Sequence, residues 1–85
     1  MRVKLVSEEH KLFLEISDFQ QGNDQRVCVS VKFADGRIIP LLRLAAEVNP
    51  LMVRVDAFRE FYGSSVQFIA RIELDIGQSQ DKSVV

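Results

Sequence analysis

Two alternating runs on either side of an Asp-Gly pair constrain this chain more than any other feature. In the first run valines alternate with polar or small residues, as in a half-buried strand. Asp35-Gly36 favours a two-residue type I′ turn. A turn at this place gives every apolar residue of the first run an apolar partner, and the predicted pairs are Phe33–Ile38, Val31–Pro40, Val29–Leu42 and Val27–Leu44. Because turn and alternation agree, they fix one register, and we predict a hairpin over residues 26–44.

The second strand of this hairpin has two ambiguous features. Pro40 cannot donate a ladder hydrogen bond, so the strand should lie at a sheet edge or bulge there. Residues 41–48 have a second interpretation as a separate short helix, because Ala45-Ala46-Glu47 favours helix.

The remaining elements follow from alternation and capping signals. A first hairpin should pair Leu5 with Leu12 and Val3 with Leu14. A helix is predicted over about 50–62, because Asn49 suits an N-cap, Pro50 the first helical position and Gly63 the residue past the end. Leu51, Val55, Phe58 and Tyr62 recur at helical spacing along it. The last strand runs over residues 66–76.

These elements predict the α+β class. We expect a mainly antiparallel sheet of about five strands, with the helix (about 50–62) packed on one face and the element order βββ-β-α-β. Residues 1–76 should form a single domain, and residues 77–85 a flexible tail. The tail ends in Ser83-Val84-Val85, which is similar to ligands of PDZ domains, although an inert tail is the simpler interpretation.

Composition excludes several classes of function. The net charge of −1 gives no electrostatic attraction to nucleic acid or to an acidic membrane. The 85 residues contain no apolar run of membrane-spanning length and no signal-peptide pattern, so a cytoplasmic location is expected. One cysteine and one histidine cannot supply the usual zinc ligands, and no phosphate-binding glycine loop is present. We therefore expect no metal and no cofactor.

The chain contains two candidate catalytic residues, and the sequence around each of them argues against catalysis. His10 lies in a predicted loop beside Glu8 and Glu9, which favours a solvated side chain. Cys28 lies on a strand face opposite the valines and is better explained as a small, partly buried filler than as a nucleophile. No small-molecule substrate is evident, and we expect that the protein is not an enzyme.

A basic sheet face keeps nucleic-acid binding open as an alternative. Arg26, Lys32, Arg43 and Arg71 could share the outer face of the central hairpin. Such binding normally uses aromatic stacking, and Phe13 is the one aromatic residue expected on that face. Acidic residues also dilute the patch, so nucleic acid is not the preferred partner.

Apolar residues on the face away from the helix give the leading site prediction. Val6, Phe13, Ile39, Leu41 and Ile69 all point that way, although this second face should be mostly polar. We therefore predict an interface with another protein or with a second copy, giving a homodimer. Its predicted apolar residues are Phe13, Ile39, Leu41 and Ile69, with a polar rim of Arg43 and Arg71.

The pattern of the chain resembles that of two groups of small bacterial proteins. The strand Leu12–Ile16, the run Val27–Phe33 before a glycine turn, and the helical segment Val55–Tyr62 resemble the immunity proteins of WapI-type contact toxins, although the Trp-containing segment of that family is missing. The stretch Phe33-Ala34-Asp35-Gly36-Arg37 is similar to a hairpin of antitoxin-linked domains. Both resemblances imply a small protein that acts by binding another protein.

Three hypotheses follow from the sequence. The first is a non-enzymatic protein-binding module that acts through a sheet face, with an inhibitor or immunity-type protein as one form of it. The second is a structural subunit that forms homo-oligomers. The third is a weak nucleic-acid-binding domain.

Overall fold

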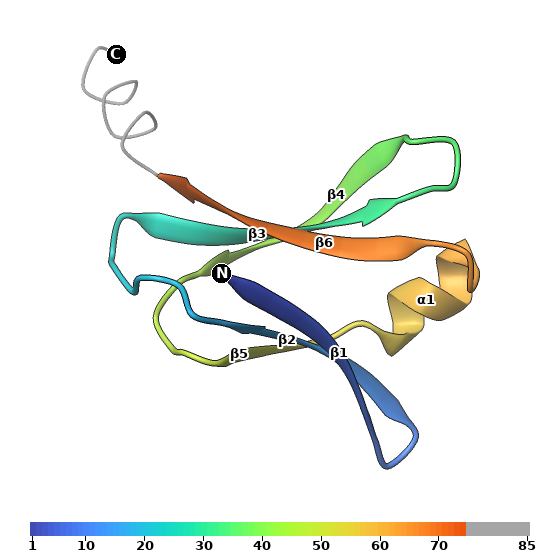
Figure 1. The fold of residues 1–85 in the computed structure, drawn as a ribbon, viewed down its shortest axis with the longest axis horizontal. Coiled ribbons are helices and arrows are strands. Elements are labelled where there is room, and N and C mark those ends of the chain that lie inside the picture. Colours follow the sequence, from blue (N-terminus) through green and yellow to red (C-terminus); the bar gives the residue numbers. More distant parts are fainter. Residues whose placement is uncertain (75–85) are drawn as a thin grey trace.

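The structure, a computed structural model, describes residues 1–74, and the predictions for the tail lie outside this range. The fold is α+β with antiparallel sheets, as predicted, but residues 1–74 contain six strands in two sheets instead of about five strands in one. One sheet has the order β1-β2-β5 and the other β4-β3-β6 (Figure 1). The elements are β1 (Arg2–Glu8), β2 (Lys11–Ser17), β3 (Gln25–Lys32), β4 (Ile38–Ala45), β5 (Leu51–Arg54), α1 (Asp56–Tyr62) and β6 (Gln67–Leu74).

The hydrophobic core lies between the two sheets. Ile16 of β2 and Val27 and Val29 of β3 are fully buried, and they pack in one cluster with Leu14 and Val53. The inner face of the β4-β3-β6 sheet is thus covered by a second sheet. The sequence pattern predicted that a helix would cover it.

The predicted helix over 50–62 is wrong in its first half. Residues 51–54 form β5, in which Leu51 and Val53 turn toward the core while Met52 and Arg54 stay exposed. The spacing from Leu51 to Val55 fits both a helical turn and every second residue of a strand, so the apolar stripe could not separate the two. The predicted N-cap residue Asn49 instead donates its side-chain N–H to the Phe19 carbonyl oxygen at 2.8 Å.

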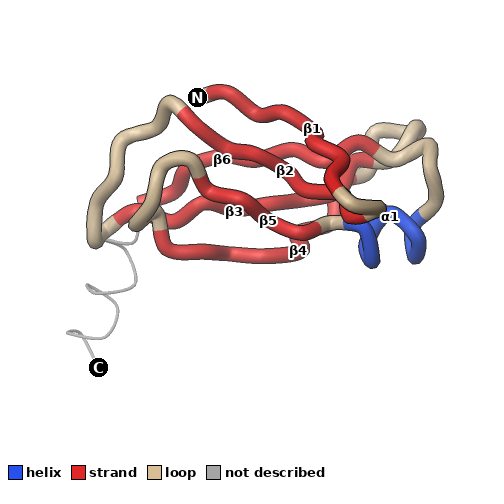
Figure 2. The backbone as a smooth tube through the Cα atoms, turned by 90° about the horizontal axis from the view of Figure 1, so that it is seen from below, coloured by secondary structure: helices blue, strands red, loops and turns tan. Residues whose placement is uncertain are grey.

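The remaining helix α1 lies at one end of the strands and covers neither sheet (Figure 2). It has seven residues, none of them buried, and it begins after Val55 without a side-chain cap. Its end at Gly63 is confirmed: this glycine has φ +97°, and its N–H donates to the Arg59 carbonyl oxygen at 2.9 Å.

The β3–β4 hairpin has the predicted register in the half that is farther from the turn and a shifted register near the turn. Val27–Leu44 and Val29–Leu42 pair as predicted, and β4 extends to Ala45, which excludes the helical interpretation of residues 41–45. Between these pairs and the turn the register shifts by one residue, so that Ser30 pairs with Pro40 and Val31 with Ile39. Pro40 therefore lies in an edge strand beside a bulge, as its missing N–H predicted.

The cause of the shift is the turn itself. Only Gly36 of the Asp35-Gly36 pair has a positive φ, so the type I′ turn does not form. Instead Phe33 and Arg37 close a three-residue loop: the Phe33 N–H donates to the Arg37 carbonyl oxygen at 2.8 Å, and the Gly36 N–H donates to the Phe33 carbonyl oxygen at 2.9 Å. Leu41 has no partner in β3 and forms the bulge, and on the far side of it from the turn the strands pair in the predicted register.

A two-residue turn does occur in the first hairpin, between β1 and β2. Glu8 pairs with Lys11 there, and both Glu9 (φ +51°) and His10 (φ +67°) are left-handed. The observed pairs Leu5–Leu14 and Val3–Ile16 differ from the prediction by two residues. An even shift leaves every side chain on its predicted face.

Replacing Glu9-His10 with Asn-Gly should raise the free energy of unfolding by about 1–2 kcal/mol, because Asn and Gly occupy the left-handed region more readily than Glu and His. Urea denaturation followed by circular dichroism measures the change. The same pair placed at Ser64-Ser65, a turn without positive φ, is the control and should give no gain. Equal effects of the two variants would contradict the turn geometry.

Candidate binding surface

The side of the β4-β3-β6 sheet that faces away from the core, which we call the outer face, carries side chains in regular cross-strand rows. Outward positions of β3 alternate with the buried valines, and each has one neighbour in β4 and one in β6. The four cross-strand rows are Ala45–Arg26–Glu73, Arg43–Cys28–Arg71, Pro40–Ser30–Ile69 and Ile38–Lys32–Gln67. The first two rows make a charged end, and the other two make an end with three apolar residues.

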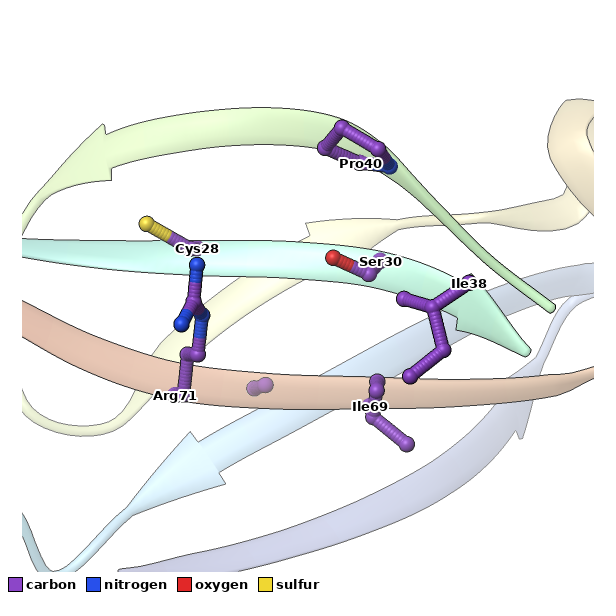
Figure 3. Close-up of a pocket in the computed structure, with 7 residues that line it drawn as sticks. Cys28, Ser30, Ile38, Pro40, Ile69 and Arg71 are labelled. Carbon is purple, nitrogen blue, oxygen red and sulfur yellow. The ribbon is translucent and has the colours of Figure 1, made fainter. Parts of the chain in front are cut away.

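A hollow lies over the middle of the outer face (Figure 3). Its volume is about 320 Å³, and it is lined by Cys28, Ser30, Ile38, Pro40, Ile69, Ala70 and Arg71. Ile38 is 53% exposed, whereas Cys28 and Ser30 on its floor are 8% and 9% exposed. The volume is at the lower end of the range for ligand pockets, about 300–1,000 Å³.

The floor of the hollow carries a hydroxyl group that has no partner in the described part of the chain. Within residues 1–74 the side chain of Ser30 makes no hydrogen bond, although the residue is almost fully buried. Its oxygen is not sealed from solvent, because no fully buried polar side-chain atom in this range lacks a partner. The hydroxyl can therefore bind a polar group that enters the hollow.

An ion-pair cluster flanks the hollow at the charged end. Glu73 lies between two arginines and contacts Arg71 through one carboxylate oxygen, while the other is 3.7 Å from Nε of Arg43. Burial raises the pKa of the Cys28 thiol, and a hydrogen bond with Glu73 and its negative charge act in the same direction. The charges of Arg43 and Arg71 oppose this shift. The thiol is therefore held protonated, which makes it a poor nucleophile.

The raised pKa predicts slow labelling of Cys28. At pH 7.4 its reaction with 5,5′-dithiobis(2-nitrobenzoate) should be at least about tenfold slower than in the urea-unfolded protein, and it should accelerate at a higher pH than in the unfolded protein. Glu73→Gln should raise the rate, because it removes the negative charge that favours the thiol. Since the pKa of the Cys28 thiol is higher in the folded protein than in the unfolded one, ionisation of the thiol favours unfolding. The free energy of unfolding is therefore unaffected by this thiol below the unfolded pKa and falls as the pH rises from the unfolded pKa through the folded pKa. Equal rates in the folded and unfolded protein would contradict this assignment.

The structure brings four of the six predicted interface residues to one part of the molecule. Arg43, Ile69 and Arg71 lie on the outer face, as predicted. Leu41 is the bulge residue and lines a second hollow beside Pro40 and Arg43.

The other two predicted residues lie elsewhere. Phe13 pairs with Val6 and Arg54 in the other sheet, so it cannot share a surface with Ile69. Ile39 pairs with the buried Val31 and therefore lies on the inner face, not on the outer face as expected. Its misplacement follows from the one-residue shift at the turn, which brings Ile38 and Pro40 to the outer face instead.

A second exposed apolar cluster lies at the end of the molecule that carries α1. Phe61 is 81% exposed, and its ring centroid is 4.8 Å from that of Tyr62, which also packs edge-on against Phe33. The Arg37 guanidinium lies over the Phe33 ring at 4.8 Å. The sequence pattern did not indicate this cluster, because helical spacing placed Tyr62 on the apolar stripe of a longer helix.

Comparisons with protein-family models, with curated proteins and with solved structures found no match to this chain. The resemblance to immunity proteins therefore stays a prediction. Within residues 1–74 no helix is long and apolar enough to cross a membrane. In the same range no three His, Cys, Asp or Glu side chains gather in a group that could hold a metal ion.

Proposed function

We propose that this chain is a non-enzymatic protein-binding module that holds another protein against its outer face. One observation carries the proposal: an open hollow with the apolar walls Ile38, Pro40 and Ile69 adjoins the charged cluster of Arg43, Arg71 and Glu73. Protein interfaces combine an apolar centre with a polar rim, and arginine is enriched in them. An inhibitor or immunity-type role, which the family resemblance implies, is the form of this function that we favour.

Packing considerations support the same surface. The hydrophobic core cluster lies between the two sheets, and the apolar residues of the outer face do not belong to it. Natural sheets usually present polar residues to solvent. Three apolar residues around a hollow are therefore better explained by a partner than by folding.

Ile69→Gln tests this proposal because it removes an apolar wall without changing the charge. The tagged protein would be used as bait in extracts of its native host, and retained proteins would be quantified by mass spectrometry. At least one protein should be retained by the wild type and reduced about tenfold with Ile69→Gln, because truncating a central apolar contact weakens binding strongly. Circular dichroism confirms that the variants are folded.

Two control baits locate the effect. Met52→Gln makes the same kind of change at a residue that is 42% exposed in the other sheet, and it should retain the partner. Phe61→Ser tests the cluster beside α1. Equal retention by Ile69→Gln and the wild type would contradict the proposal, and selective loss with Phe61→Ser would place binding at the α1 end.

Nucleic-acid binding is a second candidate, favoured by one specific observation. Arg26, Lys32, Arg43 and Arg71 all occupy the outer face, as the alternation predicted. No aromatic residue lies at an outward position of the four rows, however, so the stacking platform typical of single-strand binding is missing there. Loss of retention after nuclease treatment of the extract would favour this candidate.

A further inference from the structure

The outer face has a charge opposite to that of the chain as a whole. Four basic residues (Arg26, Lys32, Arg43 and Arg71) and one acidic residue (Glu73) occupy its rows, whereas the full chain has a net charge of −1. Arg71 lines the apolar hollow, Lys32 lies beside its wall residue Ile38, and the hydroxyl of Ser30 lies on its floor. A ligand that fits must therefore combine negative charge with an apolar group.

We propose that the outer face binds an acidic segment of the partner protein, in which an apolar side chain next to carboxylates enters the hollow. This inference rests on the proposed function and adds the chemistry of the partner. The apolar side chain contacts Ile38, Pro40 and Ile69. The neighbouring carboxylates meet Arg71 and Lys32 on either side, and the Ser30 hydroxyl donates to a carboxylate or carbonyl oxygen.

The outer face favours an acidic protein segment over two other ligands, a second copy of the chain and a nucleic acid. A second copy of the chain would bring two basic faces together, and like charges across an interface are strongly unfavourable. A nucleic acid would satisfy the arginines, but no aromatic residue lies at an outward position of the four rows to stack on its bases. The hollow would also stay unfilled, because a phosphate backbone brings no apolar side chain.

Matched peptides test the inference without knowledge of the partner. The probes are acetyl-Glu-Glu-Leu-Glu-Glu-amide, the same peptide with lysine for glutamate, the acidic peptide with serine for leucine, and the oligonucleotide (dT)10. Each is titrated into ¹⁵N-labelled wild-type protein, and amide chemical shifts are followed by NMR. The acidic leucine peptide should shift the amides of Cys28, Ser30, Ile69 and Arg71, and bind at least about tenfold more tightly than the lysine peptide.

Arg71→Met removes one positive charge and keeps a side chain of similar length. It should weaken binding of the acidic peptide about fivefold or more, and its salt dependence should fall. Lys4→Met makes the same change on the other sheet, at an exposed residue, and should leave binding unchanged. The serine peptide should also bind more weakly, because it cannot fill the hollow.

Several outcomes would overturn the inference. Equal binding of the acidic and lysine peptides, shifts confined to the other sheet, or tighter binding of (dT)10 would each do so. Peptide-independent self-association that shifts the same amides would assign the face to a second copy. If Ile69→Gln still abolishes retention of a protein in the extract experiment while the peptides show no charge preference, the proposed function stands and only the acidic partner is excluded.

Discussion

Replacing Ile16 with alanine is expected to lower the free energy of unfolding by about 2–5 kcal/mol. Ile16 is fully buried and lies in the central strand β2, where it pairs with Val3 on one side and Leu51 on the other. Truncation removes apolar contacts with the opposite sheet and leaves a cavity that a rigid core fills only in part. A domain of this size has a total stability of roughly 4–13 kcal/mol, so the loss would be a large part of it.

Urea denaturation, followed by circular dichroism, measures this loss. Val3→Ala is the matched control, because Val3 lies on the same face of the neighbouring strand but is 40% exposed. It should lower the free energy of unfolding by less than about 1 kcal/mol. A similar loss for both variants would mean that Ile16 does not lie in the centre of the core.

Val53→Ala is expected to lower the free energy of unfolding by about 2 kcal/mol. Val53 is 6% exposed and pairs with Leu14 in the β2–β5 ladder, so the change removes two buried methyl groups and weakens a strand. The helical interpretation of residues 50–62 predicts the opposite sign, because Val53 is outside the apolar stripe and alanine has the highest helix propensity. The sign of the change thus separates strand from helix.

Thermal and urea unfolding of Val53→Ala and Met52→Ala provide this comparison. Met52 is the exposed neighbour in the same strand, and its replacement should change the free energy by no more than about 0.5 kcal/mol. An increase in stability with Val53→Ala would show that residues 51–54 are not part of the sheet.

The parts of the fold that could be predicted were those fixed by period-two alternation. Val27 and Val29 of β3 were correctly paired with Leu44 and Leu42, because the alternation places all four on the same face of the hairpin. The β1–β2 hairpin kept its faces for the same reason, although its register differed by two residues.

The errors arose where one local signal fits two structures. Asp35-Gly36 suits a type I′ turn and equally a three-residue loop with glycine at its last position, and this choice moved Ile39 to the inner face. Leu51, Val53 and Val55 alternate as a strand, but Leu51 and Val55 also lie one helical turn apart. Sequence periodicity could not decide these cases, because Val53 is buried by packing between the two sheets, and this is a tertiary contact.

The candidate surface was predictable in part. Arg43, Ile69 and Arg71 follow from alternation along β4 and β6; Ile69 and Arg71 line the first hollow, and Arg43 and Arg71 line the second. Ile38 and Pro40 were missed because their face depends on the turn, and Ser30 was missed because a small polar residue on a strand has no signal for burial. Phe13 was misplaced because a one-sheet architecture put all outward residues on the same side.

The most direct test of the central claim, that the outer face is where a partner binds, uses the thiol already present there. Cys28 is the only cysteine of the chain and lies on the floor of the hollow. Its rate of alkylation by N-ethylmaleimide at pH 8.5 would be measured by mass spectrometry in the free protein and in the complex isolated with the wild-type bait. We predict at least a tenfold slower reaction in the complex, because the partner covers the hollow. An unchanged rate with the partner fully bound would contradict this account.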